Sequence, residues 1–188
     1  MDRWRQTVRW AWATKLRRAG VVLGPAFVLA FSWRMAWVVP YAFPWDVRIA
    51  LTDNSPAMLL SVDPEERWED EPWIVGPPAY PLLAGRRILG TTLLTAPEKR
   101  RLVQAMFAGM ASHMVPIEAN CFNPRHALQV SHAGVTYDIL ICFECLQVYV
   151  VQAGDQRDRI AKLLIDGWPK PVFDDMLTAH HVPLSPKD

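Results

Sequence analysis

The sequence is poor in glycine and cysteine and carries almost no net charge. Its 188 residues include 9 glycines and 3 cysteines, and the formal net charge is +1. A glycine share below the usual ~7% disfavours nucleotide-binding folds built on glycine-rich loops. Three cysteines are too few for a small protein held together by disulfides. The balanced charge excludes an overall basic nucleic-acid binder, so we expect no nucleic-acid partner.

The common catalytic signatures are also missing. The chain contains no G-x-G-x-x-G, no P-loop, no G-x-S-x-G and no H-E-x-x-H pattern. What it has is 51% hydrophobic residues and 16 prolines. This composition excludes a disordered chain, and the length suits one domain of roughly 100–150 residues with an appendage.

The first 45 residues combine a basic start with an apolar stretch. Residues 1–20 carry six basic residues against Asp2, a net charge of +5, which leaves −4 for the remainder. Thirteen uncharged residues follow, Val21–Trp33. A basic segment before an apolar one is the layout of a secretory signal or signal anchor. We therefore predict a transmembrane anchor within residues 19–40, with the N-terminus cytoplasmic and the remainder exported.

Two other interpretations of this segment remain open. Val28-Leu29-Ala30 resembles a small-residue cleavage site, so the protein could be secreted after signal cleavage. The segment could instead form a buried or interfacial helix of a soluble protein, with Arg34 directed to water. In the anchor interpretation, an outer aromatic belt would be formed by Trp33, Trp37, Tyr41 and Trp45.

The remaining pattern predicts an α+β fold preceded by residues 1–45, a basic N-terminal segment that contains the apolar anchor helix. Residues 46–80 are acidic and rich in Pro and Trp, which indicates a linker with short strands at Val47–Leu51 and Ala57–Val62. Residues 81–188 then form one α+β domain. We expect Arg87–Leu94 to be a strand or a short approach segment.

Within that domain we expect a small antiparallel sheet packed against helices. Thr95 and Glu98 form a capping-box pattern that opens a helix near residues 96–113. Residues 126–143 read as a hairpin that turns at Ala133-Gly134, and residues 145–151 supply a further strand. The core-facing side of the second hairpin strand would be formed by Tyr137, Ile139, Ile141 and Phe143. Further helices are expected over residues 155–180.

All three cysteines lie in two short motifs that flank the predicted hairpin. The first runs Cys121-Phe122-Asn123-Pro124-Arg125-His126 and the second Ile141-Cys142-Phe143-Glu144-Cys145. At these motifs the chain resembles an uncharacterised group of small bacterial proteins, many of them exported or lipid-anchored. The resemblance covers roughly residues 80–185 and implies architecture and export without an established activity. With it, the anchor would place the protein in a bacterial inner membrane, its C-terminal domain outside the cytoplasm.

The cysteine cluster admits four interpretations. Soft thiolates and an imidazole suit tetrahedral zinc, and the ligands of such a site would be Cys121, His126, Cys142 and Cys145. An exported domain could instead hold a structural disulfide, most naturally from Cys121 to Cys142 or Cys145. Cys142 and Cys145 could form a thiol–disulfide redox pair, or all three cysteines could be small buried hydrophobic residues.

The two motifs also contain one acid and one base in apolar surroundings. We predict that Arg125 binds Glu144 across the sheet as a structural ion pair. The sequence favours a membrane-anchored or exported domain with a non-enzymatic binding or structural role. The alternative is a thiol- or metal-dependent enzyme that uses the cysteine and histidine cluster.

Overall fold

The protein is described by a computed structural model that covers residues 28–30, 32–33, 39–67, 81–113, 121–153 and 155–186. Most of the predicted anchor, residues 19–40, lies outside these described residues. Within them, no helix is both long and apolar enough to cross a membrane.

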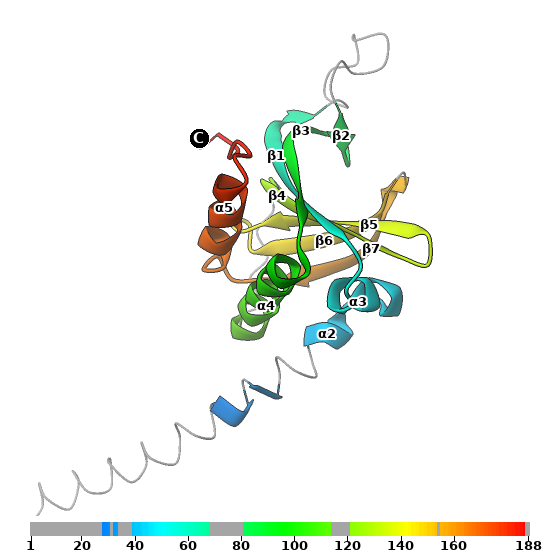
Figure 1. The fold of residues 1–188 in the computed structure, drawn as a ribbon, viewed down its shortest axis with the longest axis vertical. Helices are drawn as coiled ribbons and strands as arrows, with labels where there is room; N and C mark the ends of the chain where they lie inside the picture. The colour runs from blue at the N-terminus through cyan, green and yellow to red at the C-terminus, as the bar shows by residue number, and fades with distance from the viewer. Residues whose placement is uncertain are drawn as a thin grey trace, which may run out of the picture.

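Seven strands form one antiparallel sheet in the order β2-β3-β1-β4-β5-β6-β7. The sheet curls, so that β1 and β3 cross the direction of β5, β6 and β7 steeply (Figure 1). The strands are β1 (Ala57–Arg67), β2 (Leu82–Leu83), β3 (Arg86–Leu94), β4 (His126–His132), β5 (Val135–Cys142), β6 (Gln147–Gln152) and β7 (Asp155–Leu164). The helices are α2 (Val39–Ala42), α3 (Trp45–Thr52), α4 (Ala96–Ser112) and α5 (Lys170–Ala179).

The predicted α+β class is confirmed, but the sheet is larger than expected. The hairpin of β4 and β5 turns at Ala133 and Gly134, which have φ of 50° and 81°. Such positive angles are what a two-residue hairpin turn requires. In addition, β1 pairs with both β3 and β4, so it lies inside the sheet. The short strand predicted at Ala57–Val62 is therefore confirmed, and it lies in the middle of the sheet as part of β1.

Two predicted elements have the wrong type. Val47–Leu51 belongs to helix α3, where Val47, Ala50 and Leu51 are buried at helical spacing. Residues 155–164 form strand β7, although their leucine and isoleucine spacing fits a helix. Pairing with β6 decides this case: Ala161 and Leu163 pack against the core, and the backbone completes the hydrogen bonds of β6.

Helix α4 begins and packs as the sequence predicts. Glu98 Oε2 accepts hydrogen bonds from the backbone N–H of Thr95 at 2.8 Å and from its hydroxyl at 2.7 Å. These bonds lower the pKa of Glu98 to about 2. The buried stripe of this helix consists of Leu102, Val103, Met106, Phe107 and Met110. This stripe joins the main core between the helices and one face of the sheet.

Each face of the sheet has its own hydrophobic cluster. The helix-covered face carries Tyr137, Ile139, Ile141 and Phe143 of the main core, which confirms their predicted direction. The other face holds a smaller cluster made of Leu60, Val62, Leu83, Ala127, Leu140 and Val151, against which Phe122 and Tyr149 pack. The two cysteine motifs lie at one end of the sheet, around the start of β4 and the end of β5.

Candidate functional site: a cluster of three cysteines

A four-residue turn places two cysteines close together. Cys142 is the last residue of β5, and Cys145 lies in the turn that leads to β6. Their Cα atoms are 5.2 Å apart, within the range of disulfide-bonded cysteines. The two residues form a disulfide, and each is 1% exposed. Cysteines with C-x-x-C spacing can meet only at a turn, because positions i and i+3 of a regular strand face opposite sides of the sheet.

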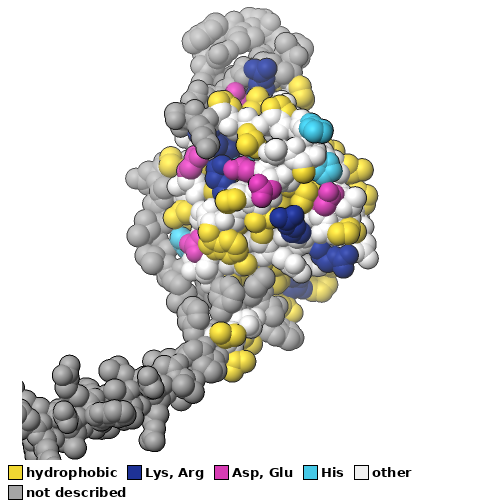
Figure 2. Space-filling view, turned by 60° about the vertical axis from the view of Figure 1, so that its left-hand side comes forward, with side chains coloured by type: hydrophobic (Ala, Val, Ile, Leu, Met, Phe, Trp, Pro, Cys, Tyr) yellow, Lys and Arg dark blue, Asp and Glu magenta, His cyan; other side chains and the backbone are white. Residues whose placement is uncertain are grey.

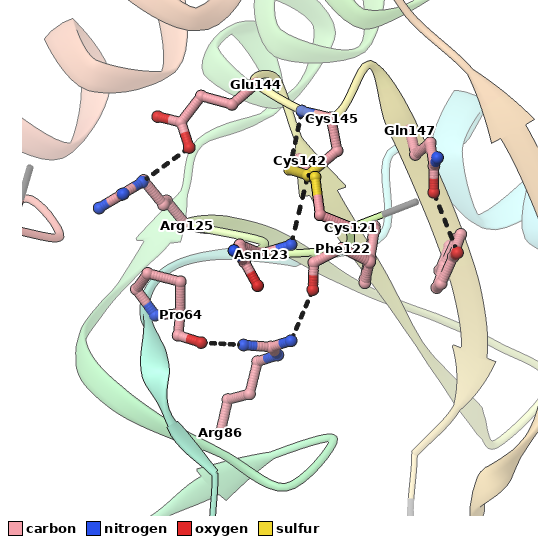
Figure 3. The surroundings of a disulfide bond; sticks show 11 residues. Pro64, Arg86, Cys121, Phe122, Asn123, Arg125, Cys142, Glu144, Cys145 and Gln147 are labelled. Atoms are coloured by element: carbon pink, nitrogen blue, oxygen red, sulfur yellow. Dashed lines mark hydrogen bonds and ion pairs between the residues drawn. A yellow bond between two sulfur atoms is a disulfide. The ribbon is translucent and has the colours of Figure 1, made fainter. Parts of the chain in front are cut away.

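The third cysteine lies against this disulfide. Cys121 is a free, exposed thiol, and its Sγ is 3.0 Å from Sγ of Cys145 (Figure 3). Among the four interpretations of the sequence, the one with a structural disulfide paired Cys121 with Cys142 or Cys145. In the structure the disulfide joins Cys142 and Cys145, the two cysteines that the turn brings together, and Cys121 remains a free thiol. All three sulfur atoms therefore lie in one contiguous group.

Two contacts hold the backbone next to Cys121. The ring of Phe122 stacks on Tyr149 of β6, with centroids 3.6 Å apart and an interplanar angle of 13°. The guanidinium of Arg86 donates to the carbonyl of Phe122 at 2.6 Å and to the carbonyl of Pro64 (Figure 3). Because Phe122 is fixed at its ring and at its carbonyl, the preceding thiol is held at the disulfide.

Backbone amides lie next to two of the three sulfur atoms. The N–H of Cys145 donates to Sγ of Cys142 at 3.1 Å, and the N–H of Asn123 approaches Sγ of Cys145 at 3.5 Å. An amide N–H that points at sulfur stabilises a thiolate more than a neutral thiol. If the disulfide opens, the buried Cys142 sulfur therefore has a donor for its negative charge.

His126 does not join the cysteines. It pairs with Ile141 and Ser61 across the sheet and so lies on the helix-covered face, whereas Cys142 pairs with Gln147. Its Nε2 is 2.7 Å from Oδ1 of Asp174, and its ring packs edge-on against Phe143 and Phe173. The structure therefore brings together three members of the predicted zinc quartet and directs the fourth elsewhere. Among the described residues, no group of three His, Cys, Asp or Glu side chains has the arrangement of a metal site.

Arg125 and Glu144 lie as the sequence pairs them. Nε of Arg125 donates to Oε2 of Glu144 at 3.1 Å (Figure 3). The two side chains are 7% and 51% exposed. Nη1 of Arg125 also donates to the carbonyl of Pro186 and to the hydroxyl of Ser185 at 3.4 Å. Since Glu144 lies between the two bonded cysteines, this arginine links their turn to the C-terminal segment.

Sequence reasoning missed Arg86, Phe122 and Tyr149 as parts of the site. Their contribution depends on long-range contacts, since Arg86 and Tyr149 belong to strands far from Cys121 in the sequence. The only signal was the position of Phe122 next to a cysteine. Family models, curated proteins and solved structures give no match to the chain.

Proposed function

We propose that this protein is a membrane-anchored domain that carries out thiol–disulfide exchange at Cys121, Cys142 and Cys145. The observation that supports the proposal is the 3.0 Å contact between the exposed Cys121 sulfur and the buried Cys145 sulfur. Thiol–disulfide exchange requires a thiolate next to a disulfide sulfur, and the three cysteines supply both groups within one site. This reaction belongs to the thiol-dependent alternative raised by the sequence.

The internal step is an isomerisation. The thiolate of Cys121 attacks Sγ of Cys145, so a Cys121–Cys145 bond forms and the Cys142–Cys145 bond breaks. Cys142 leaves as a thiolate next to the N–H of Cys145 and then takes up a proton. No electrons enter or leave the protein in this step, and the disulfide moves from a buried position to one that includes an exposed sulfur.

The external step is exchange with a dithiol of a protein or peptide. One partner thiolate attacks Sγ of Cys121, which gives a mixed disulfide and releases Cys145 as a thiolate. The second partner thiolate then attacks the partner's own sulfur in the mixed disulfide and releases Cys121. The partner is oxidised to a disulfide and the domain is reduced to three thiols. The same steps in reverse oxidise the domain.

The location is part of the same proposal. We propose that residues 19–40 anchor the chain in a bacterial inner membrane, with the domain outside the cytoplasm. A stable disulfide is expected in such an oxidising compartment and is rare in the cytosol. Flotation of the full-length protein with phospholipid vesicles tests the anchor, and recovery in the soluble fraction without detergent or cleavage would contradict it.

The experiment for the chemistry measures oxidation of a fluorescent dithiol peptide by the full-length protein. We expect the wild type and Asn123→Ala to oxidise the peptide alike, because only the backbone of Asn123 touches the cluster. In Cys121→Ser the rate should fall to that of oxidised glutathione. In Cys142→Ser, mass spectrometry after thiol blocking should find a Cys121–Cys145 disulfide. Equal rates for the wild type and Cys121→Ser would overturn the proposal.

A second function is favoured by the burial of Cys142 and Cys145. Each of these cysteines is 1% exposed. In this second function their disulfide stabilises the turn of a binding or structural domain and takes no part in exchange. In that case Cys121 would be labelled as the sole free thiol in every preparation, and no mixed disulfide would form. The thiol-blocking experiment above separates the two functions.

A further inference from the structure

The outer side of α2 and α3 exposes aromatic side chains that the core does not use. These helices bury Val39, Val47, Ala50 and Leu51, while Tyr41 and Trp45 are 60% and 64% exposed. We call Tyr41, Trp45 and Arg48 the aromatic face. A soluble surface tolerates single exposed aromatics, but a contiguous group indicates a contact surface.

Arg48 organises this aromatic face. Its Cζ lies 4.0 Å from the ring centroid of Tyr41 and 4.4 Å from that of Trp45. The guanidinium therefore packs against two exposed rings through cation–π contacts. Among the described residues, no carboxylate forms an ion pair with Arg48. Its planar donors are available for a phosphate, which guanidinium groups bind in a bidentate manner.

Exposed apolar side chains precede the aromatic face in the sequence and indicate what covers it. Trp33, eight residues before Tyr41, is 62% exposed, and Val28 and Leu29 are 60% and 70% exposed. They belong to the uncharged stretch that follows the basic residues of the N-terminus. In Figure 2, hydrophobic side chains are visible at the lower end of the described part of the molecule. Figure 1 places α2 and α3 at that same end.

We propose that the aromatic face rests on the phospholipid bilayer, with Tyr41 and Trp45 at the headgroup level and Arg48 bound to lipid phosphate. Tyr and Trp rings are enriched at membrane–water interfaces because one end is apolar and the other polar. This inference rests on the proposed membrane anchor and adds a second contact that orients the domain on the membrane. It is independent of the cysteine chemistry.

The test uses the full-length protein in vesicles of phosphatidylcholine and phosphatidylglycerol, the former brominated near the headgroup. Tryptophan quenching by bromine is compared for the wild type and Trp45→Phe, with Trp168→Phe as the matched control. Trp168 is also exposed, at 51%, but lies just before α5. Arg48→Gln is compared with Arg159→Gln, since Arg159 also lies over a tyrosine ring, that of Tyr149.

We expect the quenched fraction to fall in Trp45→Phe and in Arg48→Gln. In Trp168→Phe the fraction should rise, because an unquenched tryptophan is removed, and in Arg159→Gln it should not change. Circular dichroism confirms that each variant is folded. A protein that floats with vesicles but shows no loss of quenching in Trp45→Phe would overturn the aromatic-face proposal alone. A protein that does not float would overturn the anchor and this inference together, and the peptide-oxidation experiment would still test the cysteine site.

Discussion

Lys99 of α4 and Asp53 at the end of α3 form an ion pair with Nζ 2.9 Å from Oδ1. The side chain of Lys99 is only 3% exposed, and its Nζ also donates to the carbonyls of Asp53 and Ser55 at 3.1 and 2.9 Å. Although burial acts in the opposite direction, hydrogen bonds from Ser55 and Lys99 lower the pKa of Asp53. The pair attaches the first turn of α4 to the turn before β1.

Replacing Lys99 with Met should therefore destabilise the domain. The change leaves Asp53 without its buried cation and two carbonyls without their donor. Because the side chain of Asp53 is 34% exposed, water can still reach its carboxylate, and the variant should lose about 1–3 kcal/mol. Urea unfolding measures this loss. Arg100→Met, at an exposed position of the same helix, is the control and should change the free energy of unfolding by less than about 0.5 kcal/mol.

His126 and Asp174 should make the domain lose stability in acid. Burial lowers the pKa of His126, although its hydrogen bond to Asp174 acts in the opposite direction. Burial raises the pKa of Asp174, but hydrogen bonds from His126 and Lys170 outweigh it and bring the pKa to about 2. Within the described residues, Nδ1 of His126 has no hydrogen-bond partner, which fits a neutral ring that donates from Nε2.

The direction in which stability changes with pH follows from proton uptake by the unfolded state. Below a pH of about 6.5 the unfolded state protonates this histidine before the folded state does. Below a pH of about 4 it does the same for Asp174. Stability should therefore fall in both ranges as the pH is lowered. Urea unfolding at a series of pH values checks this, and His126→Gln should flatten the change near neutral pH only. An unchanged slope there would contradict a neutral His126 in the fold.

Asp138 should have the opposite pH dependence. Burial raises its pKa, while a hydrogen bond from Nε2 of Gln129 at 2.7 Å acts in the other direction. A raised pKa means that the stability contribution is present below the unfolded value and is lost as the pH rises through the folded value. Asp138→Asn keeps the acceptor for Gln129 and removes the buried charge. We expect this variant to be more stable than the wild type at pH 7, with a difference that shrinks in acid.

Arg125 should matter more for stability than Glu144. Glu144 is half exposed, so Glu144→Gln should cost less than about 1 kcal/mol. Arg125 is buried and donates to three acceptors, so Arg125→Met should cost about 2–3 kcal/mol. Arg125→Lys should restore little of this, because an ammonium lacks the planar fork of donors. Thermal unfolding compares the three, and equal effects of Glu144→Gln and Arg125→Met would contradict this ranking.

Local patterns were enough to predict several elements. The capping box at Thr95 and Glu98 marks the start of α4 through bonds within one turn. The two-residue turn at Ala133 and Gly134 fixes the register of β4 and β5. In each case the signal lies within a few residues, so its physical cause is visible in the sequence.

Other features depend on contacts between distant segments. Strand β7 exists because β6 offers an edge whose backbone needs partners, and this demand overrides a helical spacing of apolar residues. His126 turns away from the cysteines because its strand register places it on the helix-covered face, next to Asp174 of α5.

The cysteines show both kinds of cause. Their spacing alone indicated that all three would gather at one hairpin. The choice of partners followed from the turn after β5, which joins Cys142 to Cys145. The stacking of Phe122 on Tyr149 then holds Cys121 beside them as the exposed thiol. Spacing along a chain limits which residues can meet, but strand register and packing across the sheet select which of them do.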